Sequence, residues 1–248
     1  MKIAGIIPAR YASTRFPGKP LADIGGQSLI ERVYRQVRQT TCIQEVVVAT
    51  DDERILRHVL DFGGQAVMTR SDHASGTDRC AEVAEALSGF DIVVNIQGDE
   101  PFIRPEQIEA ALVPLLHSSD AGIATLAQKM DRREDVFNPN VVKVVFNERG
   151  RALYFSRSPI PYLRGIPEAE WPGDIDFYKH IGLYAFRREV LSELTRLPMS
   201  AHERAESLEQ LRWLDAGYSI AVSVTPFETI GVDTPEDVAR ALLEGLGQ

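Results

Sequence analysis

The chain has 248 residues, of which 44% are hydrophobic and 25% charged, and its 27 basic and 36 acidic side chains give a formal net charge of -9. This length allows one large domain or two small ones with a substantial buried core. An acidic chain is a poor candidate for binding nucleic acid along a basic face, so we expect a local cationic pocket for a small anion instead.

Cysteine usage and hydropathy narrow the class of protein further. Cys42 and Cys80 have no C-x-x-C spacing, which argues against a disulfide framework or a thiolate zinc site. No signal peptide precedes the first strand-like run, and no apolar stretch approaches the ~20 residues that cross a bilayer. We therefore expect a soluble cytoplasmic protein without a membrane partner.

The first half of the chain predicts alternating strands and helices. Continuous β-branched runs indicate strands buried on both faces of a parallel sheet. Apolar residues at helical spacing indicate amphipathic helices between them. The predicted strands are 2–8, 45–50, 65–68 and 91–97, and the predicted helices are 28–39, 53–64, 78–87 and 104–116. This alternation is typical of a three-layer α/β/α sandwich with right-handed crossovers and a mostly parallel, Rossmann-like sheet.

The pattern changes after about residue 122. Strands are predicted at 122–127, 140–146, 152–156, 179–186 and 219–224, one helix at 204–215, and another at the end of the chain. The turn at 147–150 favours an antiparallel pair. We expect a single domain over 1–248 with an antiparallel β lobe inserted at about 140–187.

The loop after the first strand, "ARYASTRFPGK", gathers the cations Arg10, Arg15 and Lys19. The carboxyl ends of parallel strands are where open α/β sheets bind ligands. Small residues there let backbone N–H groups approach an anion, and three cations suit a triphosphate. The alternative is a solvated basic turn. The loop is neither a Walker A loop nor a G-x-G-x-x-G motif.

Two aspartates are candidates for a metal site. Gly98 follows the strand at 91–97 and, having no side chain, lets a ligand come close to Asp99. The carboxylate oxygens of Asp99 and Glu100 at this sheet edge suit Mg²⁺. The alternative to a metal site is a structural role, in which this turn caps the next helix. Asp233 precedes "TPED", a capping box that does not require it, and it would complete a two-carboxylate site if the fold brought it near Asp99.

Other signals are weaker. Ser75, Gly76 and Thr77 precede a helix and suit either a nucleotide contact or an N-cap. Several polar residues stand in apolar segments, and a lone histidine is more often structural than functional: Arg157, His180, Tyr184, Glu209 and Gln210. We find no Ser/His/Asp order, Cys/His pair or histidine cluster that would indicate covalent or zinc catalysis.

These motifs together resemble a known family. "IIPARYASTRFPGKPL", "MTRSDHASGTDR", "VNIQGDEP", "ALYFSRSPIP" and "VDTPED" occur in the order found in the 3-deoxy-manno-octulosonate cytidylyltransferases, or CMP-Kdo synthetases. The resemblance extends from Ile6 to about Val238, and the opening segment and "ALYFSR" are its most specific parts. It implies a nucleotidyltransferase sheet and a Mg²⁺-dependent reaction in which CTP and the acid sugar Kdo give CMP-Kdo and diphosphate for lipopolysaccharide biosynthesis.

The resemblance also implies roles for particular residues. Lys19, Asp99 and Asp233 would be catalytic, with Asp99 and Asp233 as the metal ligands. The nucleotide would be bound by Arg10, Arg15, Lys19, Ser75, Gly76, Thr77, Arg79 and Gln97. The sugar would be bound by Arg157, His180, Tyr184, Glu209 and Gln210. Members of the family are typically homodimers, and the inserted lobe would supply an interface.

Three other functions remain open. The first two are a CMP-8-amino-Kdo synthetase and a CMP-sialic acid synthetase, which would differ in the sugar they accept. The third is a nucleotide-binding regulator without catalytic activity, which would bind CTP and release no diphosphate.

Overall fold

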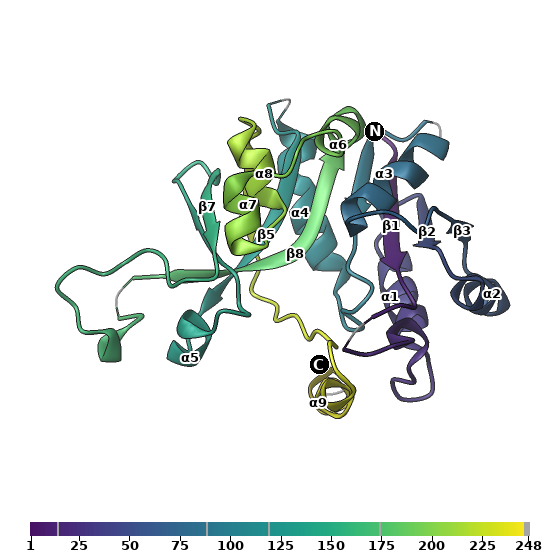
Figure 1. The fold of residues 1–248 in the computed structure, drawn as a ribbon, viewed down its shortest axis with the longest axis horizontal. Coiled ribbons are helices and arrows are strands. Elements are labelled where there is room, and N and C mark those ends of the chain that lie inside the picture. The colour runs from purple at the N-terminus through teal and green to yellow at the C-terminus, as the bar shows by residue number, and fades with distance from the viewer. Residues whose placement is uncertain (14, 88, 119, 174, 246–248) are drawn as a thin grey trace. The chain divides into compact units, whose positions relative to one another are not determined.

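The computed structural model describes residues 1–13, 15–87, 89–118, 120–173 and 175–245. The fold is mixed α/β with mostly parallel strands, as the sequence predicts (Figure 1). The chain divides into two compact units. Unit 1 comprises Met1–Glu109, Ala185–Thr195 and Glu228–Gln248, and unit 2 comprises Ala110–Tyr184 and Arg196–Phe227.

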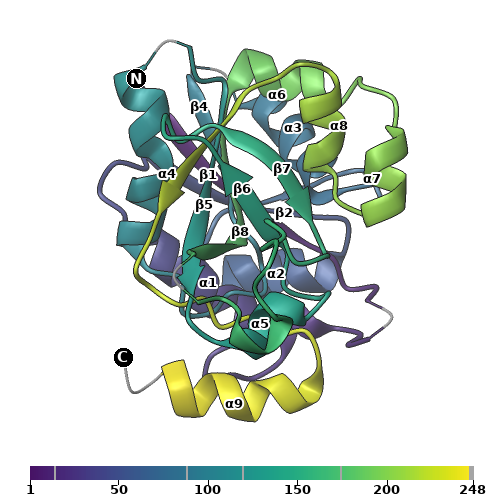
Figure 2. The ribbon, with the colours of Figure 1, turned by 90° about the vertical axis from the view of Figure 1, so that its left-hand side faces the viewer.

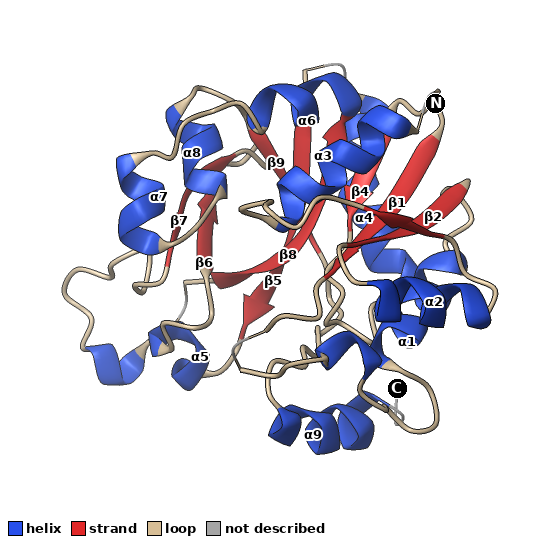
Figure 3. Ribbon diagram, turned by 45° about the vertical axis from the view of Figure 1, so that its right-hand side comes forward, coloured by secondary structure: helices blue, strands red, loops and turns tan. Residues whose placement is uncertain are grey.

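Unit 1 contains four parallel strands and most of the longer helices. Its strands are β1 (Ile3–Ala9), β2 (Glu45–Thr50), β3 (Ala66–Met68) and β4 (Ile92–Asn95). Its helices are η1 (Lys19–Leu21), α1 (Leu29–Arg38), α2 (Glu53–Asp61), α3 (Gly76–Ala86), α6 (Arg188–Leu194) and α9 (Pro235–Gly245). Figure 3 distinguishes these strands from the helices.

The strand order in unit 1 is β3-β2-β1-β4, and every neighbouring pair is parallel. Ala9 lies opposite Thr50, and Thr50 lies opposite Met68. Because the strands run in one direction, their carboxyl ends meet at one edge. The loops that leave this edge carry the cationic segment, Asp51, the 69–75 turn and Asp99.

Unit 2 contains β5 (Ile123–Met130), β6 (Lys143–Phe146), β7 (Ala152–Ser156) and β9 (Ile220–Val224). Its helices are α5 (Arg133–Phe137), η2 (Glu168–Glu170), α7 (Ala201–Glu206) and α8 (Gln210–Asp215). Two elements contain a boundary between the units, namely α4 (Pro105–His117) and β8 (Phe177–Arg187). Figure 2 gives a second view of the same elements.

The pairing in unit 2 is mixed. β5 and β9 are parallel, whereas β6 pairs antiparallel with β7 through the predicted turn at 147–150 and with β8 on its other side. Most of the expected lobe at 140–187 falls in unit 2, and the assignment of the whole chain to a single domain stays a prediction.

The helix predicted at 204–215 is wrong as one element. It is divided into α7 and α8 by Ser207, whose φ of 52° is left-handed. A serine rarely adopts this conformation, because its Cβ crowds the backbone there. The Leu208 N–H returns to Glu203 O at 3.3 Å and closes the first helix. Helical periodicity continues across the break, so the sequence pattern does not reveal it.

Gly98 packs against the end of β1. A Cβ at this position would lie 2.9 Å from the Pro8 carbonyl oxygen, closer than such atoms approach. The sequence suggested that this glycine clears space for a ligand, but the packing of unit 1 already requires it. Within the described residues, no helix combines the length and the hydropathy needed to span a bilayer.

We predict that Gly98→Ala lowers the free energy of unfolding by roughly 1–3 kcal/mol, because the added methyl group forces the backbone of β1 away. Urea unfolding would measure the loss. Gly231→Ala is the matched control, since a Cβ there meets no atom within 4 Å. Equal stabilities for the two variants would contradict the packing argument.

Candidate active site

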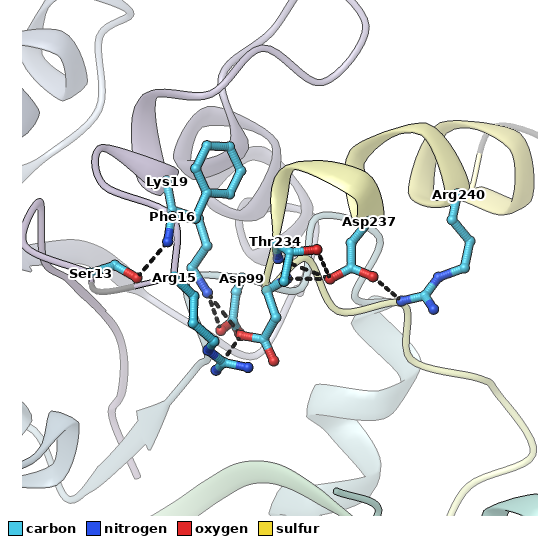
Figure 4. Close-up of polar contacts among 9 residues, drawn as sticks. Ser13, Arg15, Phe16, Lys19, Asp99, Thr234, Asp237 and Arg240 are labelled. Carbon is cyan, nitrogen blue, oxygen red and sulfur yellow. Dashed lines mark hydrogen bonds and ion pairs between the residues drawn. The ribbon is translucent and has the colours of Figure 1, made fainter.

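The cationic loop after β1 is closed by its own backbone. The Gly18 N–H donates to Tyr11 O at 2.9 Å, and the φ of Gly18 is 74°, a conformation that suits glycine. Ser13 Oγ accepts the Phe16 N–H at 3.2 Å (Figure 4). The closed loop leads directly into η1 and places Lys19 at the start of that helix.

Lys19 contacts two carboxylates from distant parts of the chain. Its Nζ lies 2.8 Å from Asp99 Oδ2 and 3.3 Å from Asp233 Oδ1. Arg15 Nη2 lies 3.1 Å from the same Asp233 oxygen (Figure 4). The Val232 N–H donates to Asp99 O at 2.9 Å and holds the two segments together. The fold therefore brings Asp99 and Asp233 together, which the sequence alone left open.

The start of α9 orients Asp233. Asp237 Oδ2 accepts the backbone N–H groups of Asp233 at 3.0 Å and of Thr234 at 2.9 Å. Burial alone would raise the pKa of Asp237, but these hydrogen bonds bring it below its ordinary value. The bond from the Thr234 N–H to Asp237 Oδ2 is one half of the predicted capping box, and the Thr234 hydroxyl donates to the same oxygen at 3.2 Å. The cap fixes the Asp233 backbone and leaves its carboxylate to face Lys19.

The two aspartates fit a Mg²⁺ ion. Both carboxylates already converge on one positive charge, the Lys19 ammonium, and their side chains are 32% and 50% exposed. Mg²⁺ is usually bound through one or two carboxylates, with water and substrate phosphates completing the shell. Among the described residues, no three His, Cys, Asp or Glu side chains form a site by themselves. Oxygen atoms of a bound phosphate would have to complete this one.

The other residues expected to bind the nucleotide lie at the ends of neighbouring elements. Arg10 donates to the carbonyl oxygen of His73. Ser75 is the N-cap of α3, and its hydroxyl accepts the Asp78 N–H at 3.1 Å. A Cβ at Gly76 would lie 3.3 Å from Pro8 Cγ, so α3 begins close against β1. Thr77 is buried and Gln97 half-buried.

Arg79 lies deeper than the sequence suggests. Its side chain is fully buried, with Nη2 2.8 Å from Asp51 Oδ2 and Nη1 bonded to Thr69. A buried ion pair of this kind is strongly destabilised when one partner is lost. Arg79 therefore connects α3 to the segment after β2, and its contact with a cytidine base stays a prediction.

The residues expected to bind the sugar belong to unit 2. His180 packs between the rings of Phe155 and Tyr184, with centroid distances of 5.0 and 5.2 Å. Its Nε2 lies 2.9 Å from Thr125 Oγ1, and that hydroxyl lies 2.8 Å from the Leu183 carbonyl oxygen. Because the hydroxyl donates to the carbonyl, it accepts from Nε2–H, which makes Nδ1 the nitrogen with the lone pair.

Burial keeps both rings uncharged. It lowers the pKa of His180 to about 3 and raises the pKa of Tyr184 well above its ordinary value. The Glu209 carboxylate adds to the shift of Tyr184. At neutral pH the pair presents a neutral imidazole and a neutral phenol, which suit sugar hydroxyl groups better than charged ones.

Arg157 is held by backbone carbonyls. Its Nε donates to Glu206 O at 2.7 Å, Nη1 to Pro139 O at 3.0 Å and Nη2 to Ser207 O at 3.4 Å. Ser207 is two residues before Glu209, the N-cap residue of α8. The structure thus connects Arg157 with the segment that carries Glu209 and Gln210, and it brings His180 and Tyr184 into contact.

Sequence reasoning missed the partners of these groups. Asp51 and His73 are polar residues in the loops that follow strands, and Thr125 is a polar residue inside a buried strand; these positions were the available signals. Lys143 and Glu206 had none, because a single charged residue in a strand or helix reads as a solvated side chain.

A family model described as Cytidylyltransferase matches residues 4–222. The chain therefore belongs to the cytidylyltransferase family. Within that family it is similar to 3-deoxy-manno-octulosonate cytidylyltransferases. The protein of that name from Parabacteroides distasonis is 56% identical over 98% of this chain and 97% of its own length. The one from Cytophaga hutchinsonii is 54% identical over 97% and 96%.

A solved structure gives the same result. The CMP:2-keto-3-deoxy-manno-octonic acid synthetase complexed with CTP is 46% identical and covers 98% of both chains, with a TM-score of 0.91. The 4-diphosphocytidyl-2C-methyl-D-erythritol synthase of Anaerococcus prevotii has a TM-score of 0.63 at 17% identity and shares the fold.

We predict that the buried imidazole makes folding sensitive to acid. Between the ordinary histidine pKa of 6.5 and about 3, the unfolded chain binds a proton that folded His180 does not. Stability therefore falls as the pH falls, by about 2 kcal/mol from pH 6.5 to pH 5. Urea unfolding at both pH values would measure this loss, and His180→Gln should lack that part of it. The same pH dependence in the wild-type chain and in His180→Gln would show that His180 is not the source of the acid sensitivity.

Proposed function

We propose that this chain is a 3-deoxy-manno-octulosonate cytidylyltransferase, which converts CTP and Kdo into CMP-Kdo and diphosphate. Near full-length similarity to proteins of that name supports the proposal. The structural observation that carries it is the convergence of Lys19, Asp99 and Asp233 at the carboxyl edge of the parallel strands. Such an edge is where α/β proteins bind nucleotides.

The reaction needs no protein nucleophile. The anomeric hydroxyl oxygen of the sugar forms a bond to the α-phosphorus of CTP and loses its proton. The bond from that phosphorus to the bridging oxygen breaks, and diphosphate leaves with the electron pair. Catalysis of such a transfer comes mainly from positioning and from neutralising the phosphate charges.

The cations of unit 1 suit the triphosphate. In our proposal Arg10, Arg15 and Lys19 bind its anionic oxygens and stabilise the leaving diphosphate. Asp99 and Asp233 would hold Mg²⁺, which supplies positive charge beside the phosphates and lowers the pKa of a bound hydroxyl. When CTP enters, Lys19 exchanges carboxylate oxygens for phosphate oxygens, so its ammonium stays paired throughout.

The neutral rings of unit 2 suit the sugar. The lone pair on His180 Nδ1 accepts a hydrogen bond from a hydroxyl group, and the phenol of Tyr184 can donate one. Arg157 supplies a cation for the sugar carboxylate, and Glu209 and Gln210 supply further polar contacts. We also propose that the protein works as a homodimer, as the resemblance implies, and in the cytoplasm, as its cysteine usage suggests.

Diphosphate release tests the proposed function. We expect release from CTP to require both Kdo and Mg²⁺ and to stop when EDTA is added. Replacing Kdo by 8-amino-Kdo or a sialic acid would identify the sugar. If the chain binds CTP but releases no diphosphate with Kdo, with 8-amino-Kdo or with a sialic acid, the proposal is contradicted and a nucleotide-binding regulator is favoured.

We predict that Asp99→Asn lowers kcat by about 100-fold or more, because the site loses a metal ligand and the charge that orients Lys19. The steady-state rate of diphosphate release measures the effect. Asp61→Asn removes the same charge from the exposed end of α2 and should leave the rate unchanged. A normal rate in folded Asp99→Asn would disprove the metal role.

A further inference from the structure

Lys143, the first residue of β6, is a lysine with no exposed surface. Its Nζ donates to the carbonyl oxygens of Asn138 at 2.9 Å, Val141 at 2.6 Å and Arg157 at 2.5 Å. An ammonium has three N–H groups, so each of them has a partner. The lysine thereby joins the turn at 138–141 to the end of β7.

Arg157 and Glu206 complete this arrangement, which we call the Lys143 hub (Lys143, Arg157 and Glu206). The Glu206 carboxylate accepts from Ser156 Oγ at 2.6 Å and from the Arg157 N–H at 2.9 Å. The Arg157 guanidinium in turn binds carbonyls of the 138–141 turn and of the break between α7 and α8. Lys143 and Arg157 therefore both bind carbonyl oxygens of the 138–141 turn.

The hub acts on a strained part of the chain. Ser207 is left-handed, which a residue with a Cβ adopts only where its surroundings enforce it. At this break, Arg157 binds the carbonyl oxygens of Glu206 and Ser207. Glu209 and Gln210 follow at once, so the direction of the break determines where these two side chains lie.

Retaining this lysine is costly. Burial, and then the charge of Arg157, lower the pKa of Lys143 to about 8, while the Glu206 carboxylate offsets part of the shift. Replacing a whole buried ion group by apolar side chains is often neutral, whereas removing one partner leaves buried polar groups unpaired. Loss of Lys143 alone would take a donor from the carbonyls of Asn138, Val141 and Arg157, so the hub contributes to stability as well as to geometry.

We infer that Lys143 is a positioning residue of the acid-sugar site: by holding the Arg157 carbonyl and the 138–141 turn, it sets the direction of the Arg157 guanidinium and of the segment bearing Glu209 and Gln210. The inference rests on the proposed function. The described contacts use three of the five guanidinium N–H groups, which leaves two to bind a carboxylate.

The test compares Lys143→Met with Val144→Ala. Val144 is the next residue of β6 and is equally buried, but neighbouring strand residues point to opposite faces. Steady-state diphosphate release is measured with Kdo and CTP varied in turn. We expect Lys143→Met to raise the KM for Kdo by about 10-fold and the KM for CTP by less than about 2-fold. Val144→Ala should lower Tm and leave both KM values unchanged.

An unchanged KM for Kdo in Lys143→Met, or equal increases in both KM values, would overturn the inference. If the methionine variant does not fold, Lys143→Gln replaces it. Glutamine keeps two N–H donors, but its side chain is shorter than that of lysine. The KM for Kdo should therefore still rise in Lys143→Gln, and an unchanged KM would refute the inference.

Amide hydrogen exchange separates this inference from the proposed function, because it needs no activity. Exchange in residues 206–210 should accelerate in the Lys143 variant and not in Val144→Ala, even if the wild-type chain shows no Kdo-dependent release. Absent release would refute the proposed function alone. Unchanged exchange at 206–210 would refute the positioning role.

Discussion

The contact on which the site depends is one ammonium group shared by two carboxylates. Asp99 and Asp233 would repel each other without a positive charge between them, and Lys19 supplies that charge. Three segments that are far apart in the sequence must therefore meet at one point. The closed loop after β1, the glycine beside Pro8 and the cap of α9 each fix one of these segments.

The two units use opposite electrostatic means. At the edge of unit 1, Arg15 and Asp233 stay accessible, with side chains 66% and 50% exposed, so phosphate or metal can exchange with the existing ion pairs. Unit 2 withdraws polar groups from water, which leaves His180 and Tyr184 neutral and binds Lys143 to carbonyls. The first arrangement suits a ligand of high charge, and the second suits a ligand recognised by its hydroxyl groups.

Local patterns predicted what depends on local physics. β-branched runs located the buried strands, and the parallel order placed Lys19 and Asp99 at the same edge. The proximity of Asp233, the burial of Arg79 against Asp51 and the Lys143 hub depend on contacts between residues far apart in the sequence. The break at Ser207 was missed because strain imposed by tertiary contacts leaves no trace in hydrophobic periodicity.

Neither unit is encoded by one continuous stretch of sequence. The chain passes from one unit to the other after Glu109, Tyr184, Thr195 and Phe227. The first of these points lies inside α4 and the second inside β8. A gene fragment cut at either point would end within a hydrogen-bonded element, so the residues proposed to bind the nucleotide and those proposed to bind the sugar cannot be separated by truncation. Exchanging the sugar specificity between relatives would require point substitutions in unit 2, not the transfer of a module.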